Sequence, residues 1–78
     1  MEVHGKLEGK QIFMLHGVPY HRVFYTHRDD PESVFQCQLA ESEFDGDLDV
    51  GDPIVISYLL KTVLAIRRDT TATPQEAT

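Results

Sequence analysis

The sequence predicts a small all-β domain whose five strands close into a barrel. Stretches of β-branched and aromatic residues recur along the chain, and Gly, Pro and Asp lie between them, which is typical of strands joined by short turns. Apart from one acidic connection that can hold a short helix, no stretch indicates a helix. A barrel also removes the exposed edges that a small open sheet would carry.

The first predicted strand covers residues 11–16. Residues 1–9 alternate Val, Gly and Leu with polar residues and are expected to be a lead-in that pairs along part of its length. The strand itself is apolar on both faces, as expected where the barrel covers one face and a partner covers the other. Gly and Pro within residues 17–19 end it.

The second predicted strand covers residues 20–26, which are aromatic and β-branched. Because side chains alternate along a strand, Val23 and Tyr25 share one face with His21. Phe24 lies on the opposite face. We therefore expect one face of this strand to pack in the core.

The third predicted strand covers residues 33–40 and follows a turn at residues 29–32, where two Asp and a Pro favour a reversal of the chain. Here Phe35, Cys37 and Leu39 point one way and the glutamines between them point the other way. This alternation is typical of a half-buried strand.

The fourth predicted strand begins at a tight turn, after a solvated acidic connection over residues 41–47 that can hold a short helix. Gly51 can adopt a positive φ, and Asp52 can accept a hydrogen bond from the local backbone. Pro53 donates no backbone hydrogen bond and therefore suits the first residue of a strand. The strand is expected to run through residues 53–60.

The last predicted strand covers residues 63–67, after a hairpin turn or a bulge at Lys61 and Thr62. Residues 70–78 lack apolar anchors and are expected to form a disordered C-terminal tail behind a single domain of residues 1–69. Five short strands with short links predict an OB-like barrel, with an SH3-like barrel as the alternative.

The small size of the chain favours self-association. A chain of 78 residues buries too little surface for a large core, and its single cysteine, Cys37, cannot form an intrachain disulfide. We therefore expect a homo-oligomer, with a dimer as the first choice. No apolar run approaches the ~18 residues that span a bilayer, and no signal-type segment begins the chain. We expect a cytoplasmic protein without membrane insertion.

The formal net charge of −6 argues against nucleic acid and anionic membranes as partners. Arg67 and Arg68 are adjacent on a strand, so they face opposite ways and form no joint clamp. The acidic stretch at residues 45–49 resembles a calcium loop, but Val50 and Ile56 stand where such a loop needs Gly and a bidentate Glu.

No metal site, cofactor or enzymatic activity is predicted. The four histidines lack the local spacing of a zinc motif, and only one cysteine could join them. No nucleophile elbow, phosphate loop or dinucleotide fingerprint occurs. Cys37 and Ser57 lie in strand patterns that indicate structural roles.

Three stretches of the sequence give it a family resemblance: residues 7–10 (LEGK), 48–57 (LDVGDPIVIS) and 63–66 (VLAI). On these the chain resembles a TOBE domain, the transport-associated OB-type barrel, over residues 3–68. TOBE domains end many ATPase subunits of ABC importers and also occur as small free-standing proteins. The resemblance implies an accessory or regulatory role in ABC-type transport, with an ABC transporter component as a possible partner.

Free-standing members of that family, the molbindins, bind molybdate or tungstate between subunits. Their Ser-Ala-Arg-Asn run precedes the leucine-x-glycine, where this chain has Glu2-Val3-His4-Gly5. Oxyanion binding therefore stays an alternative function. Its candidate donors are Lys6, His4, Lys61 and Thr62.

The main hypothesis is a non-enzymatic TOBE-like module that acts through self-association or partner binding. Its candidate interface residues are Phe13, Leu15, Phe24 and Leu59. A second alternative is single-stranded nucleic-acid binding of the OB type, with bases stacked on Phe24 and Tyr25.

Overall fold

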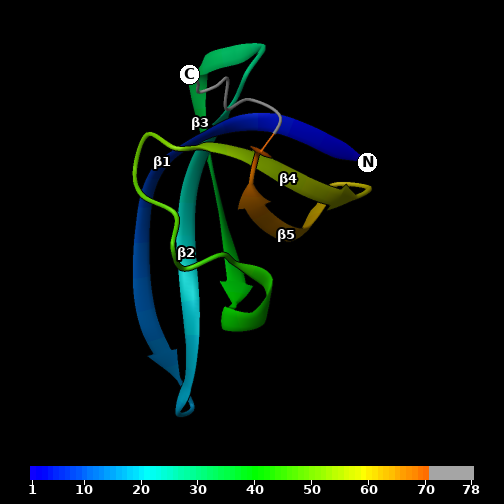
Figure 1. The fold of residues 1–78 in the computed structure, drawn as a ribbon. Coiled ribbons are helices and arrows are strands. Elements are labelled where there is room, and N and C mark those ends of the chain that lie inside the picture. The colour runs from blue at the N-terminus through cyan, green and yellow to red at the C-terminus, as the bar shows by residue number, and fades with distance from the viewer. Residues whose placement is uncertain (71–78) are drawn as a thin grey trace.

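The structure, a computed structural model, describes residues 1–70 and confirms the predicted all-β class (Figure 1). Five antiparallel strands form one sheet in the order β3-β2-β1-β4-β5. The strands are β1 (Glu2–Leu15), β2 (Val18–His27), β3 (Asp30–Ala40), β4 (Pro53–Leu59) and β5 (Thr62–Arg68). The sheet coils around a core as a small OB-like barrel.

The barrel is only partly closed. Its edge strands, β3 and β5, are not neighbours in the hydrogen-bonded order of the described strands. An isolated parallel bridge joins Ile66 of β5 to Phe44, which follows the short 3-10 helix η1 (Glu41–Glu43) at the end of β3. OB folds are often partly open in this way.

Strand β1 is longer than predicted, because the expected lead-in forms its first half. Its N-terminal part pairs with β4, from Glu2 opposite Ser57 to Lys6 opposite Pro53. From Gly5 onward it pairs with β2, and a bulge interrupts the register between Leu7 and Gly9. The pattern of residues 1–9 is weak because this half of β1 contains two glycines, which carry no side chain to signal a strand.

Gly5 lies where β1 is paired on both sides, and it makes the close approach to β2 possible. A Cβ at this position would lie 2.0 Å from the backbone carbonyl oxygen of Thr26 and 3.2 Å from Cδ1 of Ile56. The first distance is far below any van der Waals contact, so no residue other than glycine fits without a backbone shift.

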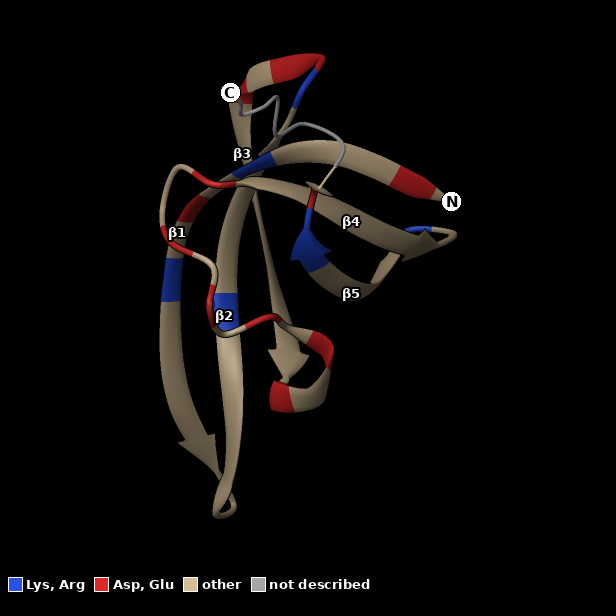
Figure 2. Cartoon of the chain, viewed as in Figure 1, with Lys and Arg blue, Asp and Glu red and all other residues tan. Residues whose placement is uncertain are grey.

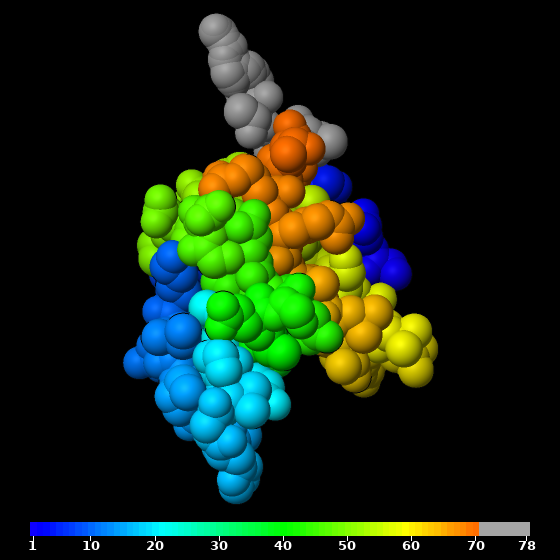
Figure 3. Space-filling model, turned by 60° about the horizontal axis from the view of Figure 1, so that its bottom comes forward, coloured from blue at the N-terminus to red at the C-terminus, as the bar shows by residue number. Residues whose placement is uncertain are grey.

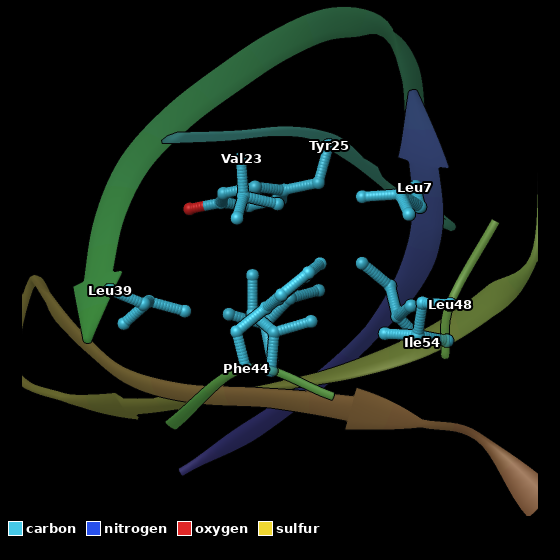
Figure 4. Packing of buried hydrophobic residues seen from close by; sticks show 9 residues of the cluster. Leu7, Val23, Tyr25, Leu39, Phe44, Leu48 and Ile54 are labelled. Carbon is cyan, nitrogen blue, oxygen red and sulfur yellow. The ribbon is translucent and has the colours of Figure 1, made fainter. Parts of the chain in front are cut away.

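The core lies between the two halves of the coiled sheet, and its side chains come from every strand and from the β3–β4 connection (Figure 4). Val23, Tyr25 and Leu39 are buried, as the alternation in β2 and β3 predicts. The buried core cluster consists of Leu7, Val23, Tyr25, Leu39, Phe44, Leu48, Ile54, Ile56 and Ile66.

Phe44 comes from the acidic connection that was expected to be solvated, and Leu48 follows that connection directly. Phe44 is 4% exposed and Leu48 is fully buried. The 3-10 helix η1 lies in this connection, where the sequence allows a short helix, and Phe44 follows it into the core. These two apolar residues fill the space that five strands alone leave empty.

Two turns differ from their predicted positions. Arg28 and Asp29 form the β2–β3 turn, whereas Asp30 already pairs with His27 and begins β3. The β4–β5 turn consists of Leu60 and Lys61, so that β4 ends one residue earlier than expected. Leu60 has a φ of 57°, a conformation that its sequence does not signal. The expected tail lies outside the described residues from residue 71 onward.

The turn before β4 is docked against β1. Gly51 has a φ of 98°, and the backbone N–H of Asp49 donates to Oδ2 of Asp52 at 2.9 Å. The backbone N–H of Gly51 donates to the carbonyl of Leu7 at 2.7 Å, and that of Leu7 donates to the carbonyl of Asp52 at 3.0 Å. The turn therefore continues the sheet where the β1–β4 pairing ends at Pro53.

Replacement of Gly5 by alanine tests the close approach of β1 to β2. We expect Gly5→Ala to lower the free energy of unfolding by about 2–3 kcal/mol, because the added methyl group forces the backbones of β1 and β2 apart. Urea denaturation followed by circular dichroism measures the change. Gly46→Ala is the control: no atom lies within 4 Å of its Cβ position and its φ is not positive. Equal stability of the two variants would contradict the packing described here.

Candidate functional site

The β1–β2 hairpin extends past the barrel and forms an arm of residues 11–22 (Figures 1 and 3). Its strands stay paired to the tip, where Leu15 lies opposite Val18. His16 and Gly17 form the two-residue turn, with φ values of 53° and 79°. Positive φ at both positions suits the right-handed twist of a hairpin, so the arm is well defined locally.

The outer face of the arm is aromatic. Phe13 and Tyr20 are paired across the strands, with ring centroids 6.0 Å apart in a stacked arrangement. The guanidinium of Arg22 lies 5.1 Å from the centroid of the Phe13 ring. Leu15 and Val18 continue this face to the tip, with 45% and 46% of their surfaces exposed.

The inner face of the arm is apolar as well. Near the barrel, the ring of buried His21 lies 4.8 Å from that of Phe44. Farther out, Ile12 and Met14 are 65% and 63% exposed, since the core ends before it reaches them. The sequence predicted apolar residues on both faces of this stretch, with one face covered by the barrel. That assignment is wrong for Ile12 and Met14.

Charge is distributed away from the arm. Figure 2 shows acidic residues in η1, in the β3–β4 connection and around the β2–β3 turn. Between residues 11 and 22, Arg22 is the only Asp, Glu, Lys or Arg. The arm is thus a nearly uncharged surface on a chain of net charge −6.

The structure brings three of the four predicted interface residues to one face. Phe13 and Leu15 alternate along β1, and Gly9, which precedes them on that face, lies opposite Phe24. Leu59 lies outside the arm, at the end of β4, and is 62% exposed. Val18 and Tyr20 were missed as members of this surface. The two-residue His-Gly turn between apolar stretches was the signal that could have revealed the hairpin.

The predicted oxyanion donors do not form one cluster. His4 and Lys6 lie opposite Val55 and Pro53, at the start of β4, whereas Lys61 and Thr62 lie in and after the turn at its end. His4 and Lys6 each lie close to a carboxylate already. Nδ1 of His4 lies 2.6 Å from Asp69, and Nζ of Lys6 lies 3.6 Å from Glu8.

Asp69 anchors the end of β5 against β1. Its side chain is 1% exposed and also lies 3.5 Å from the guanidinium of Arg28, while its backbone N–H donates to the carbonyl of Pro53 at 3.1 Å. Burial of a carboxylate is costly unless it is paired, and His4 and Arg28 supply that pairing. This arrangement gives His4 a structural role that the spacing of the sequence did not indicate.

Tyr25, one of the two rings expected to stack on nucleic-acid bases, is unavailable for that role. It is 3% exposed and belongs to the core, so only Phe24 of that pair lies on the outer face. Within residues 1–70 no group of three or more His, Cys, Asp or Glu side chains could hold a metal ion. The described residues also contain no helix of sufficient length and apolarity to cross a membrane.

Comparisons with known proteins place the chain in no group. No protein-family model, curated protein or solved structure matches it.

Cys37 is half-buried on the inner face of β3 and packs against the core. Burial raises the pKa of its thiol from 9.0 to about 11. The thiolate is the nucleophilic form, so this environment suppresses the reactivity of Cys37 near neutral pH.

We therefore expect N-ethylmaleimide to modify Cys37 in the folded chain about 100-fold more slowly at pH 8 than in the urea-unfolded chain, because two pKa units lower the thiolate fraction by that factor. Mass spectrometry of quenched samples measures the rate. The folded-chain rate should rise about tenfold per pH unit between pH 7 and 9. Equal rates in the two states would show that the thiol is not shielded.

Proposed function

We propose that this chain is a non-enzymatic interaction module of the cytoplasm that forms a homodimer through its β1–β2 arm. The observation that supports this proposal is the arm itself, a hairpin that projects from the barrel with apolar side chains on both faces. An isolated two-stranded hairpin is only marginally stable in water. Contiguous exposed apolar surface of this kind marks interaction sites.

A second copy of the same chain is the partner for the arm that fits the charge distribution best. Two chains of net charge −6 repel each other if their acidic turns and connections meet. The arm is almost free of charge, so contact between two arms keeps the acidic regions apart. In a twofold dimer the same patch serves both partners, and Ile12 and Met14, 65% and 63% exposed on the inner face of the arm, present an apolar surface that can pack against the same surface of the second copy.

The accessory role in ABC-type transport, implied by the TOBE resemblance, stays a prediction. In such a role the dimer would display two copies of the same barrel, and the arm would fix their relative orientation.

Substitution of Met14 tests the arm as the dimer interface. We expect the unmodified chain to be a dimer at high micromolar concentration. Met14→Glu should raise the dissociation constant of the dimer at least about tenfold, because it puts a charge on each of two apposed apolar surfaces. Because Met14 is 63% exposed in the single chain, the substitution should lower the free energy of unfolding by less than about 0.5 kcal/mol. Size-exclusion chromatography with multi-angle light scattering measures the mass.

Leu59→Glu is the matched control. It introduces the same charge at a residue of nearly equal exposure, 62%, at the end of β4 and outside the arm. This variant should remain a dimer. A monomeric unmodified chain, or an equal effect of the two substitutions, would overturn the proposal.

A further inference from the structure

A cavity of about 460 Å³ lies on the open side of the barrel, away from the arm. Its walls come from β3, at Phe35 and Cys37, and from β5, at Val63. These are the two edge strands that do not pair among the described residues. The cavity therefore occupies the gap that full closure of the barrel would have filled.

Aromatic rings form much of the cavity wall. The rings of His27 and Phe35 are stacked with centroids 4.4 Å apart, and the ring of Tyr25 is 5.7 Å from that of Phe35. The rings of Tyr58 and His27 are nearly perpendicular, with centroids 5.9 Å apart. The rings come from three different strands and hold one another in place. A planar apolar ligand would meet a preformed surface here.

The same rings carry a short hydrogen-bond network. The hydroxyl of Tyr58 lies 2.8 Å from that of Tyr25 and 2.9 Å from Nε2 of His27. If Tyr25 donates to Tyr58, then Tyr58 donates to His27. In the reverse direction His27 donates to Tyr58, Tyr58 donates to Tyr25, and the Tyr25 hydroxyl retains a proton for another acceptor. The network can thus supply a donor to an acceptor in the cavity without leaving a group unpaired.

The charge of the cavity is opposite to that of the chain. The chain has thirteen acidic and seven basic residues, yet no Asp or Glu lines this cavity. Lys61, in the exposed β4–β5 turn, is part of the lining. A cationic ligand would find no carboxylate, whereas an anion would find an ammonium group and the hydroxyl–imidazole network.

We propose that this cavity binds a small planar aromatic carboxylate. The ring lies between Phe35 and Val63, and the carboxylate interacts with Lys61 at the cavity mouth. The volume falls within the range of about 300–1,000 Å³ that is typical of small-molecule sites and suits one or two fused rings. The site is separate from the arm, so its occupation does not depend on dimer formation.

Isothermal titration calorimetry with naphthoate tests the proposal. Naphthamide, which has the same rings without the charge, and cyclohexanecarboxylate, which has the charge without an aromatic ring, are the comparison ligands. We expect naphthoate to bind at least about tenfold more tightly than either. No binding of naphthoate, or equal binding of all three, would overturn the proposal.

Substitutions then locate the site. Val63→Trp fills the cavity and should abolish binding, whereas Leu64→Trp, on the opposite face of β5 at a 46% exposed residue, should preserve it. Lys61→Gln should lower the affinity for naphthoate at least about fivefold and leave the affinity for naphthamide unchanged. Loss of binding in Leu64→Trp with retention in Val63→Trp would place the ligand elsewhere and contradict the proposal.

Cys37 provides an independent reporter, because it is the only cysteine of the chain and lines the cavity. Saturating naphthoate should slow its modification by N-ethylmaleimide in the unmodified chain at least about threefold, and cyclohexanecarboxylate should not. This measurement remains decisive if Val63→Trp does not fold. An unchanged rate at saturation would show that the ligand binds outside the cavity.

Discussion

The shape of this protein depends on β1 being shared between two strands. Its first five residues pair with β4, the strand from Gly5 onward pairs with β2, and the two pairings overlap at Gly5 and Lys6. The overlap requires a very close approach of backbones, which Gly5 permits because it has no side chain. Without this approach the β1–β2–β3 and β4–β5 parts could not form one coiled sheet.

Both candidate functional surfaces follow from the unequal lengths of the strands. β1 and β2 pair well past the end of the core, so they produce the arm. β5 has seven residues, whereas β3 has eleven, and the two edges do not pair. The same sheet therefore extends beyond the core in the β1–β2 hairpin, and it does not close between β3 and β5. The first leaves apolar surface exposed, and the second leaves a cavity.

The acidic residues support this arrangement. They are concentrated in η1, the β3–β4 connection and the turns, where their side chains remain solvated. Two carboxylates also act locally: Arg67 lowers the pKa of Glu2 at the start of β1, and the backbone N–H of Asp49 lowers the pKa of Asp52 in the turn before β4. The arm and the cavity lack carboxylates, so a chain of high negative charge keeps two surfaces that an apolar or anionic partner can approach.

The sequence by itself determined the all-β class, the number of strands and the inward faces of β2 and β3, because alternation is a local property of a strand. It also indicated the turn at Gly51 and Pro53 through their backbone preferences. Only the tertiary structure decided that Phe44 and Leu48 enter the core and that His4 pairs with Asp69, 65 residues away. It also decided that β3 and β5 do not pair with each other. These outcomes depend on strand length and register, which residues distant in the sequence settle together and no local pattern encodes.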